Sequence, residues 1–204
     1  MKPLAFLTLL GVLPVVAADR DLPAASEVRL DDVNGKMQRV IAADERKATV
    51  LFFVLHDCPV ANSYAPEISR IAEEYAARGV RCFVVYAEAD LPAREAKQHA
   101  KDYAYRCPAL IDSDHFLVSL AKATVTPEAA IFSATGDLIY RGRIDDRAVR
   151  PGLKKPEPEV RDLRTALDDL LDGRLKTPRF TKAVGCYIPQ RDETAARPKA
   201  LSPR

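Results

Sequence analysis

The sequence predicts an α/β fold with a central mixed β-sheet, helices on its faces and a C-terminal tail. Two continuous apolar, β-rich runs, at 48–55 and 80–86, indicate strands that are buried on both faces. Segments with helical spacing of apolar residues alternate with the strands, which favours parallel pairing. A late strand–turn–strand over 129–144 adds an antiparallel edge. We therefore expect one domain over residues 28–173, within a few residues at each end.

The remaining elements follow from local signals along the chain. The Asn34-Gly35 turn predicts a short hairpin near the start of the domain, and Gly79 and Gly173 are typical helix ends. Three prolines among charged residues predict a loop over 147–159, and residues 174–204 are expected to form the tail. The expected helices are 66–78, 93–105, 115–122 and 160–171, and the further strands are 109–111, 129–133 and 138–144.

Composition excludes several classes of protein. The chain has 204 residues, of which 48% are hydrophobic, so wholesale disorder is excluded. Four cysteines are too few for a fold built on disulfides, and the fold must depend on an apolar core. The net charge of +2 gives no strong attraction to nucleic acid or acidic membranes, and we expect no nucleic-acid partner.

The first eighteen residues resemble a secretory signal peptide. Lys2 precedes an apolar run from Leu4 to Val16, and Ala17 and Ala18 provide a cleavage site after Ala18. The run is too short to span a bilayer comfortably, so no stable membrane insertion is expected after cleavage. An uncleaved anchor or a buried strand is the alternative. With residues 19–27 as a lead-in, the mature protein would be periplasmic or secreted, where disulfides can persist.

Cys58 is the principal candidate for chemistry. It follows a buried strand and precedes a helix, and such junctions at the carboxyl edge of a parallel sheet are common positions for sites. Unpaired backbone N–H groups and the helix dipole favour a thiolate there, and Pro59 suits the first helical turn. A buried, inert cysteine is the alternative, but the polar context of Asp57 and Pro59 argues against it.

The residues around Cys58 resemble the active-site segment of the thioredoxin superfamily. Phe53 lies five residues before the cysteine and Pro66 eight residues after it, as in that family. Thr126 and Pro127 resemble the cis-proline loop, which lies beside the nucleophile and holds the partner's backbone. The resemblance implies a thioredoxin-like fold, with Cys58 as the nucleophile and the Thr126-Pro127 loop as the docking site.

Two shorter motifs are similar to the exported bacterial redoxins, of the alkyl hydroperoxide reductase and thiol-specific antioxidant group. The first motif contains Cys58, Pro59, Asn62 and Tyr64, and the second is Val184-Gly185-Cys186.

Three departures from the superfamily limit what the resemblance implies. Ala61 replaces the resolving cysteine of a dithiol thioredoxin, and Asp57 replaces the usual tryptophan. Leu51 and Leu55 replace the proline and the hydroxyl residue of peroxiredoxins, which argues against efficient peroxidase action.

The partner of Cys58 is left open by the sequence. Cys186 in the tail could resolve a mixed disulfide, or it could form a structural disulfide that pins the tail. Cys107 could pair with another thiol or be buried, and Cys82 is expected to be an inert core residue. Four cysteines allow three complete pairings, and Cys58–Cys186 is the preferred pair.

No cofactor is expected, and a metal site is a minor alternative. His56, Cys58 and Cys186 could together bind copper or zinc, since thiolates and imidazole suit these ions. His99 is expected to be solvated on a polar helix, and His115 to lie at a helix start.

The sequence thus predicts an exported thiol–disulfide oxidoreductase of the redoxin type, with an antioxidant role in cell redox homeostasis. Cys58 would attack, and Cys186 would resolve. A protein or a small molecule carrying a thiol or disulfide would be the substrate. The alternatives are a non-catalytic redoxin-like module that binds copper or a partner protein, and a thiol peroxidase.

Overall fold

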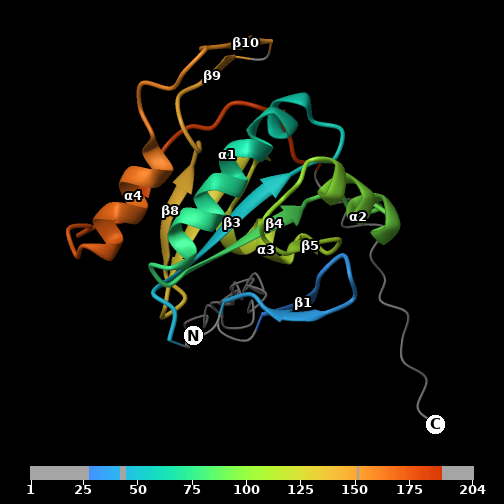
Figure 1. The fold of residues 1–204 in the computed structure, drawn as a ribbon, viewed down its shortest axis with the longest axis horizontal. Helices are drawn as coiled ribbons and strands as arrows, with labels where there is room; N and C mark the ends of the chain where they lie inside the picture. Colours follow the sequence, from blue (N-terminus) through green and yellow to red (C-terminus); the bar gives the residue numbers. More distant parts are fainter. Residues whose placement is uncertain (1–27, 42–44, 151, 190–204) are drawn as a thin grey trace, which may run out of the picture.

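The structure, a computed structural model, describes residues 28–41, 45–150 and 152–189 (Figure 1). The predicted signal peptide, the lead-in and the end of the tail lie outside the described residues. The strands are β1 Arg29–Asp31, β2 Met37–Arg39, β3 Ala48–Val54, β4 Val80–Tyr86, β5 Ala109–Ile111, β6 Val125–Thr126, β7 Glu128–Ser133, β8 Leu138–Gly142, β9 Ala148–Arg150, β10 Leu153–Lys154, β11 Arg179–Phe180 and β12 Cys186–Tyr187. The helices are α1 Pro59–Ala76, α2 Ala93–Asp102, α3 Phe116–Ala121 and α4 Asp162–Leu171.

The central sheet has six strands in the order β11-β8-β7-β3-β4-β5. β3, β4 and β5 are parallel, β7 is antiparallel to β3, and β8 is antiparallel to β7. Every residue of β3 is buried, as expected for an apolar strand that is covered on both faces. The predicted mixed sheet with flanking helices is confirmed.

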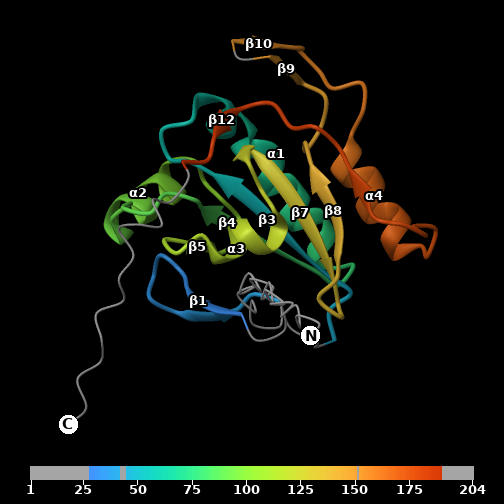
Figure 2. The same cartoon turned by 180° about the vertical axis from the view of Figure 1, so that it is seen from behind.

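Helices cover both faces of this sheet. α1, α2 and α4 lie on one face, and α3 lies on the other (Figures 1 and 2). α1 and α4 are joined through the buried Glu67 carboxylate, which accepts hydrogen bonds from Arg164 at 2.8 Å and from Arg70 at 2.9 Å. None of the helices in the described part of the chain has the length and apolar character needed to cross a membrane.

Helix α1 begins at Pro59, as the position of Pro59 after Cys58 predicts, and seven residues before the apolar spacing at Pro66 indicates a helix. Polar residues in its first turns, Asn62 and Ser63, conceal the helical periodicity. Pro59 occupies the first turn, where no N–H is needed, and Cys58 is the N-cap. The earlier start places Cys58 directly at the helix N-terminus.

Two further segments differ from the prediction. The expected loop over 147–159 contains the antiparallel hairpin β9–β10, because backbone pairing and a contact with α1 overcome the turn propensity of the prolines. That contact is the hydrogen bond from the Ala148 N–H to the Tyr64 hydroxyl, at 3.1 Å. The tail also contains strands: β11 adds to the central sheet beside β8, and β12 pairs with β6.

Candidate functional site

Cys58 lies at the carboxyl edge of the central sheet, between β3 and α1. Its Sγ accepts a hydrogen bond from the Ala61 N–H at 3.4 Å, within the first turn of α1. This N–H is one of the backbone donors that a helix start leaves without a partner in the helix. The side chain is only 1% exposed, so Cys58 is a buried thiol with a backbone donor directed at it.

The Thr126–Pro127 loop lies against Cys58. The peptide bond between Thr126 and Pro127 is cis, as the family resemblance predicts. In the thiol form Cys58 Sγ donates to the Thr126 carbonyl oxygen at 3.3 Å. The Thr126 hydroxyl is buried and has no hydrogen-bond partner among the described residues, so it can donate to Cys58 once the thiol ionises.

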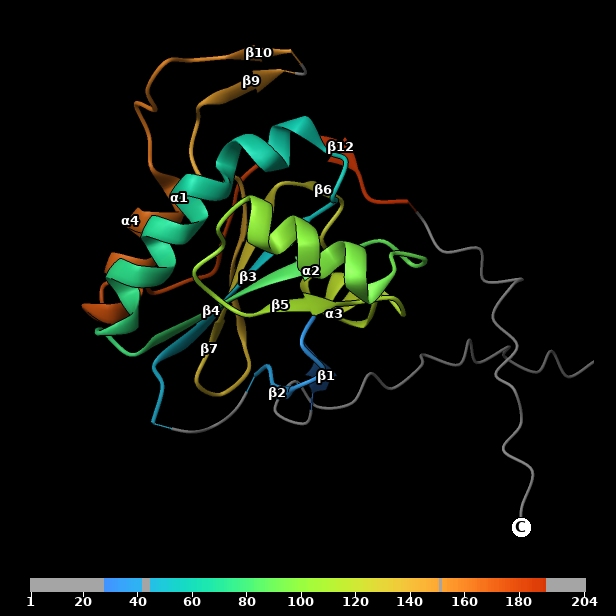
Figure 3. The ribbon, with the colours of Figure 1, turned by 45° about the vertical axis from the view of Figure 1, so that its right-hand side comes forward.

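Cys186 reaches the same place from the end of the chain. β12 runs antiparallel to β6, with Cys186 opposite Thr126 and Tyr187 opposite Val125. Figure 3 shows β12 beside β6, at the end where α1 begins. The Cys186 thiol lies close enough to Cys58 to affect its pKa, and both cysteines are free thiols in this structure. The structure therefore brings together the two cysteines that the sequence analysis preferred as a pair.

The two thiols of this pair have pKa values displaced in opposite directions. Burial raises the pKa of Cys58, but hydrogen bonds from Cys186, Thr126 and Ala61 outweigh burial and lower the pKa overall. Burial, the hydrogen bond to Cys58 and the nearby charge of Asp57 raise the pKa of Cys186. Of the two thiols, Cys58 is therefore the one that ionises more readily.

Asn62 supports the loop before the cysteine and has no direct contact with Cys58. Its side-chain amide donates to the His56 carbonyl at 3.0 Å, and its Oδ1 pairs with His99 Nε2 at 3.0 Å. His99 also pairs with the Tyr86 hydroxyl at 2.8 Å and is half-buried, so the expectation that it is solvated was wrong. Burial lowers the pKa of His99.

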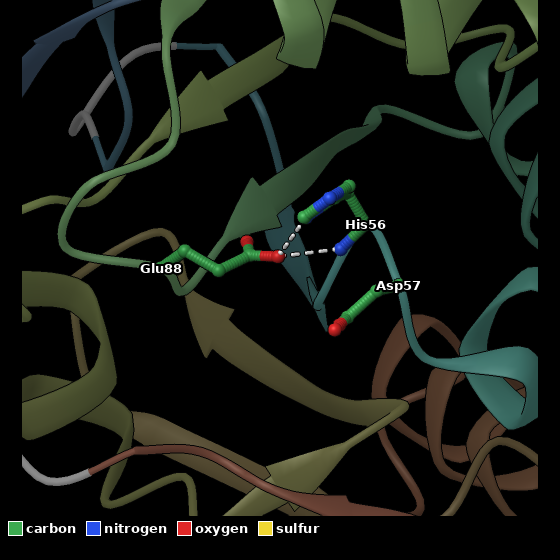
Figure 4. A group of neighbouring side chains, drawn as sticks. All are labelled: His56, Asp57 and Glu88. Carbon is green, nitrogen blue, oxygen red and sulfur yellow. Dashed lines mark hydrogen bonds and ion pairs between the residues drawn. The ribbon is translucent and has the colours of Figure 1, made fainter.

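His56 is held by a carboxylate that the sequence analysis did not identify. Glu88 Oε1 accepts from the His56 backbone N–H at 2.6 Å and lies 2.8 Å from His56 Nδ1 (Figure 4). Glu88 follows β4, at the same sheet edge as Cys58. Its position after a buried parallel strand was the signal that could have identified it.

His56, Cys58 and Cys186 do not form a close group of potential metal ligands in the described part of the chain. Among the described residues, the group of potential ligands whose donor atoms lie within 4.8 Å of one another is His56, Asp57 and Glu88 (Figure 4). Neither thiol belongs to that group, and His56 Nδ1 is paired with Glu88.

Cys82 and Cys107 lie away from this site, in and beside strands β4 and β5. Burial raises the pKa of Cys107 to about 12 and raises the pKa of Cys82 well above its ordinary value. Both are free thiols. A thiol with a raised pKa is a weak nucleophile at neutral pH, which agrees with the inert role expected for Cys82.

The fold and the cysteine at the start of α1 define a thioredoxin-like redox protein. The family model called Redoxin matches residues 17–155, and the chain belongs to this family.

Solved structures agree on the fold. An uncharacterised conserved protein from Geobacillus kaustophilus is 27% identical, with a TM-score of 0.69 over 81% of this chain and 89% of that one. A hypothetical protein from Sinorhizobium meliloti is 24% identical, with a TM-score of 0.70 over 81% and 91%. A secreted disulfide oxidoreductase from Mycobacterium tuberculosis is 14% identical, with a TM-score of 0.50 over 73% and 97%. No curated protein is significantly similar to this chain.

Proposed function

We propose that this chain is an extracytoplasmic thiol–disulfide oxidoreductase in which Cys58 is the nucleophile and Cys186 the resolving cysteine. The observation that carries the proposal is the position of Cys186 opposite Thr126, whose carbonyl contacts Cys58 at the start of α1. The pKa of Cys58 is lowered and that of Cys186 is raised. A thiolate is the attacking species in disulfide exchange. The lower pKa of Cys58 therefore favours it as the nucleophile, and Cys186 stays protonated until it resolves the mixed disulfide. Export rests on the signal-like pattern of residues 1–18.

The exchange proceeds in two steps that conserve electrons. The Cys58 thiolate attacks one sulfur of a substrate disulfide, forming a mixed disulfide and releasing the other sulfur as a thiolate that takes up a proton. Cys186 then loses its proton and attacks Cys58 Sγ, so that the second substrate sulfur leaves as a thiol. The substrate gains two electrons, and the protein ends as a Cys58–Cys186 disulfide. The reverse sequence oxidises a substrate dithiol.

Thr126 and Pro127 dock the partner in this proposal, and Pro59 and Asn62 position the nucleophile. Pro59 begins the helix whose first turn presents the Ala61 N–H to Cys58. Asn62 fixes the loop that precedes Cys58 through the His56 carbonyl.

Trapping the mixed disulfide tests the proposal. Reduced Cys186→Ser protein is incubated with insulin, a protein that contains disulfides, and the products are mapped by mass spectrometry. We expect insulin to remain covalently bound at Cys58, because no resolving thiol is present. The Cys58→Ser variant should form no adduct, and Cys82→Ser should turn over as the unmodified chain does.

Two results would count against the proposed roles. Normal turnover by the Cys186→Ser variant would show that Cys186 is not the resolving cysteine. An unmodified Cys58 under all conditions would show that it is not the nucleophile.

A further inference from the structure

The segment 183–189 occupies the edge of the site where a partner strand would bind. Cys186 and Tyr187 pair with Thr126 and Val125 in an antiparallel ladder. The Ile188 N–H continues the pairing by donating to the Thr124 carbonyl at 3.0 Å. Backbone groups at a strand edge are what an extended peptide uses when it adds to a sheet. In this structure the tail of the chain itself pairs with these backbone groups.

Gly185 allows this segment to lie directly on the Thr126–Pro127 peptide. A Cβ built at Gly185 would be 1.8 Å from the Thr126 carbonyl oxygen and 2.6 Å from its carbon. Both are backbone atoms of a buried loop, so they cannot move aside as the end of a flexible side chain would. The glycine is needed here for space, and any side chain at this position would lift the segment off the loop.

The docked segment and the loop together enclose the nucleophile. Cys58 is 1% exposed, and its sulfur contacts the Thr126 carbonyl and the Cys186 thiol. Disulfide exchange requires a substrate sulfur to reach Cys58 Sγ. With the segment docked, the place from which that sulfur would approach is held by Cys186.

The segment is attached by few contacts. Its strand β12 has two residues, and the Tyr187 side chain is 83% exposed. Ala183 and Ile188 are its buried side chains, each 8% exposed. A two-residue strand with two buried apolar side chains is the kind of element that opens locally while the core stays folded.

We propose that segment 183–189 is a built-in competitor for the substrate strand. It shields Cys58 in the reduced protein, and an extended polypeptide substrate displaces it by pairing with residues 124–126. The inference rests on the proposed function, because it concerns access to Cys58 as the attacking group. It also links the two chemical steps. When the segment returns, it displaces the substrate strand and brings Cys186 to Cys58. Cys186 then attacks Cys58 Sγ, and the substrate cysteine leaves as a thiolate that takes up a proton.

Alkylation of Cys58 in the full-length reduced chain tests this inference. Iodoacetamide is added above pH about 8.5, where an ordinary thiol ionises, so that the rate reports access more than activation. We expect Gly185→Ala to speed Cys58 alkylation by at least about tenfold, because modification no longer waits for local opening. Tyr187→Ala is the matched control on the same strand, and its rate should equal that of the unmodified chain.

A second variant and a peptide show whether faster alkylation in Gly185→Ala comes from loss of the docked segment or from misfolding. Ile188→Ala removes a buried anchor without approaching Thr126, and it should also speed the alkylation. A synthetic peptide with the sequence of residues 181–189, carrying serine at position 186, should protect Cys58 again in the Gly185→Ala chain. The same peptide with alanine at position 185 should give no protection.

The outcomes separate this inference from the proposed function. Equal alkylation rates in the unmodified chain, Gly185→Ala and Ile188→Ala would overturn the competitor role. Faster alkylation without any mixed disulfide to insulin would show that segment 183–189 shields Cys58 but would reject the oxidoreductase proposal.

Discussion

Two pairs of cysteines in this chain each combine a buried and a partly buried thiol, but the pairs differ in chemistry. Cys58 and Cys186 meet at the carboxyl edge of the sheet, where β12 places Cys186 opposite Thr126. Cys82 lies in β4, and Cys107 lies just before β5. The parallel register pairs Val84 with Ala109, and its continuation by two residues sets Cys107 beside Cys82. The charge of Cys107 contributes to the raised pKa of Cys82, which agrees with this placement.

Burial acts in the same direction on all four thiols, and hydrogen-bond donors make the difference. Desolvation raises the pKa at every one of these positions. Only Cys58 has a set of donors strong enough to reverse the effect, and they come from the start of α1, from the loop at Thr126 and from Cys186. The direction of each pKa shift therefore depends on the donors to the sulfur, and exposure alone would not predict it.

Oxidation should produce the largest difference between the two pairs of cysteines, because only one pair should form a disulfide. Treating the reduced protein with diamide should join Cys58 to Cys186 while Cys82 and Cys107 remain thiols. Closing a loop of this length should raise the free energy of unfolding by up to about 5 kcal/mol. Mass mapping identifies the bridge, and urea unfolding with and without oxidation measures the gain. If the first disulfide to form contains Cys82 or Cys107, the proposed difference between the two pairs is wrong. In the Cys186→Ala control, oxidation should not raise the free energy of unfolding.

Alkaline pH should destabilise the fold through the second pair. The folded pKa values of Cys82 and Cys107 are raised, so above the unfolded pKa of about 8.5 the unfolded chain loses protons that the folded chain keeps. The free energy of unfolding of the reduced protein should then fall by about 1.4 kcal/mol per pH unit for each such thiol.

Urea unfolding of the reduced protein across this pH range tests whether Cys82 and Cys107 cause the loss of stability. A chain carrying both Cys82→Ala and Cys107→Ala should be less stable at neutral pH, because two buried sulfurs are lost, but should have a flatter dependence on alkaline pH. Parallel pH profiles for the two chains would show that these thiols do not titrate in this way.

The sequence predicts the position of Cys58 well and that of Cys186 only as a preference. A buried strand followed by a helix places Cys58 through local signals, which are contained in a few neighbouring residues. The pairing of β12 with β6 has no such signal, because a two-residue strand shows no periodicity. The need for glycine at 185 depends on contact with Thr126, a residue distant in the sequence.

The same reason explains the hairpin that the sequence analysis missed. Prolines predict irregular structure over 147–159, and they do so from local information. The hairpin is held by partners elsewhere in the chain. Tyr64 on α1 accepts from the Ala148 N–H, and the same hydroxyl donates to Asp145 at 2.6 Å. Non-local contacts of this kind override local propensity, and a single sequence does not display them.

Removing the Cys186 thiol should give the smallest and most specific effect. After burial, the hydrogen bond from Cys186 is the largest influence on Cys58, and it lowers the pKa. In a chain that also carries Cys82→Ala and Cys107→Ala, Cys186→Ala should therefore raise the pKa of Cys58, as measured by ultraviolet absorbance of the thiolate. Cys186→Ser keeps a donor at this position and should raise it less. An unchanged pKa in both variants would mean that Thr126 and the first turn of α1 suffice to hold the thiolate. The lowered pKa of Cys58 would then persist while the tail is displaced, and the attack on a substrate would not weaken when Cys186 moves away.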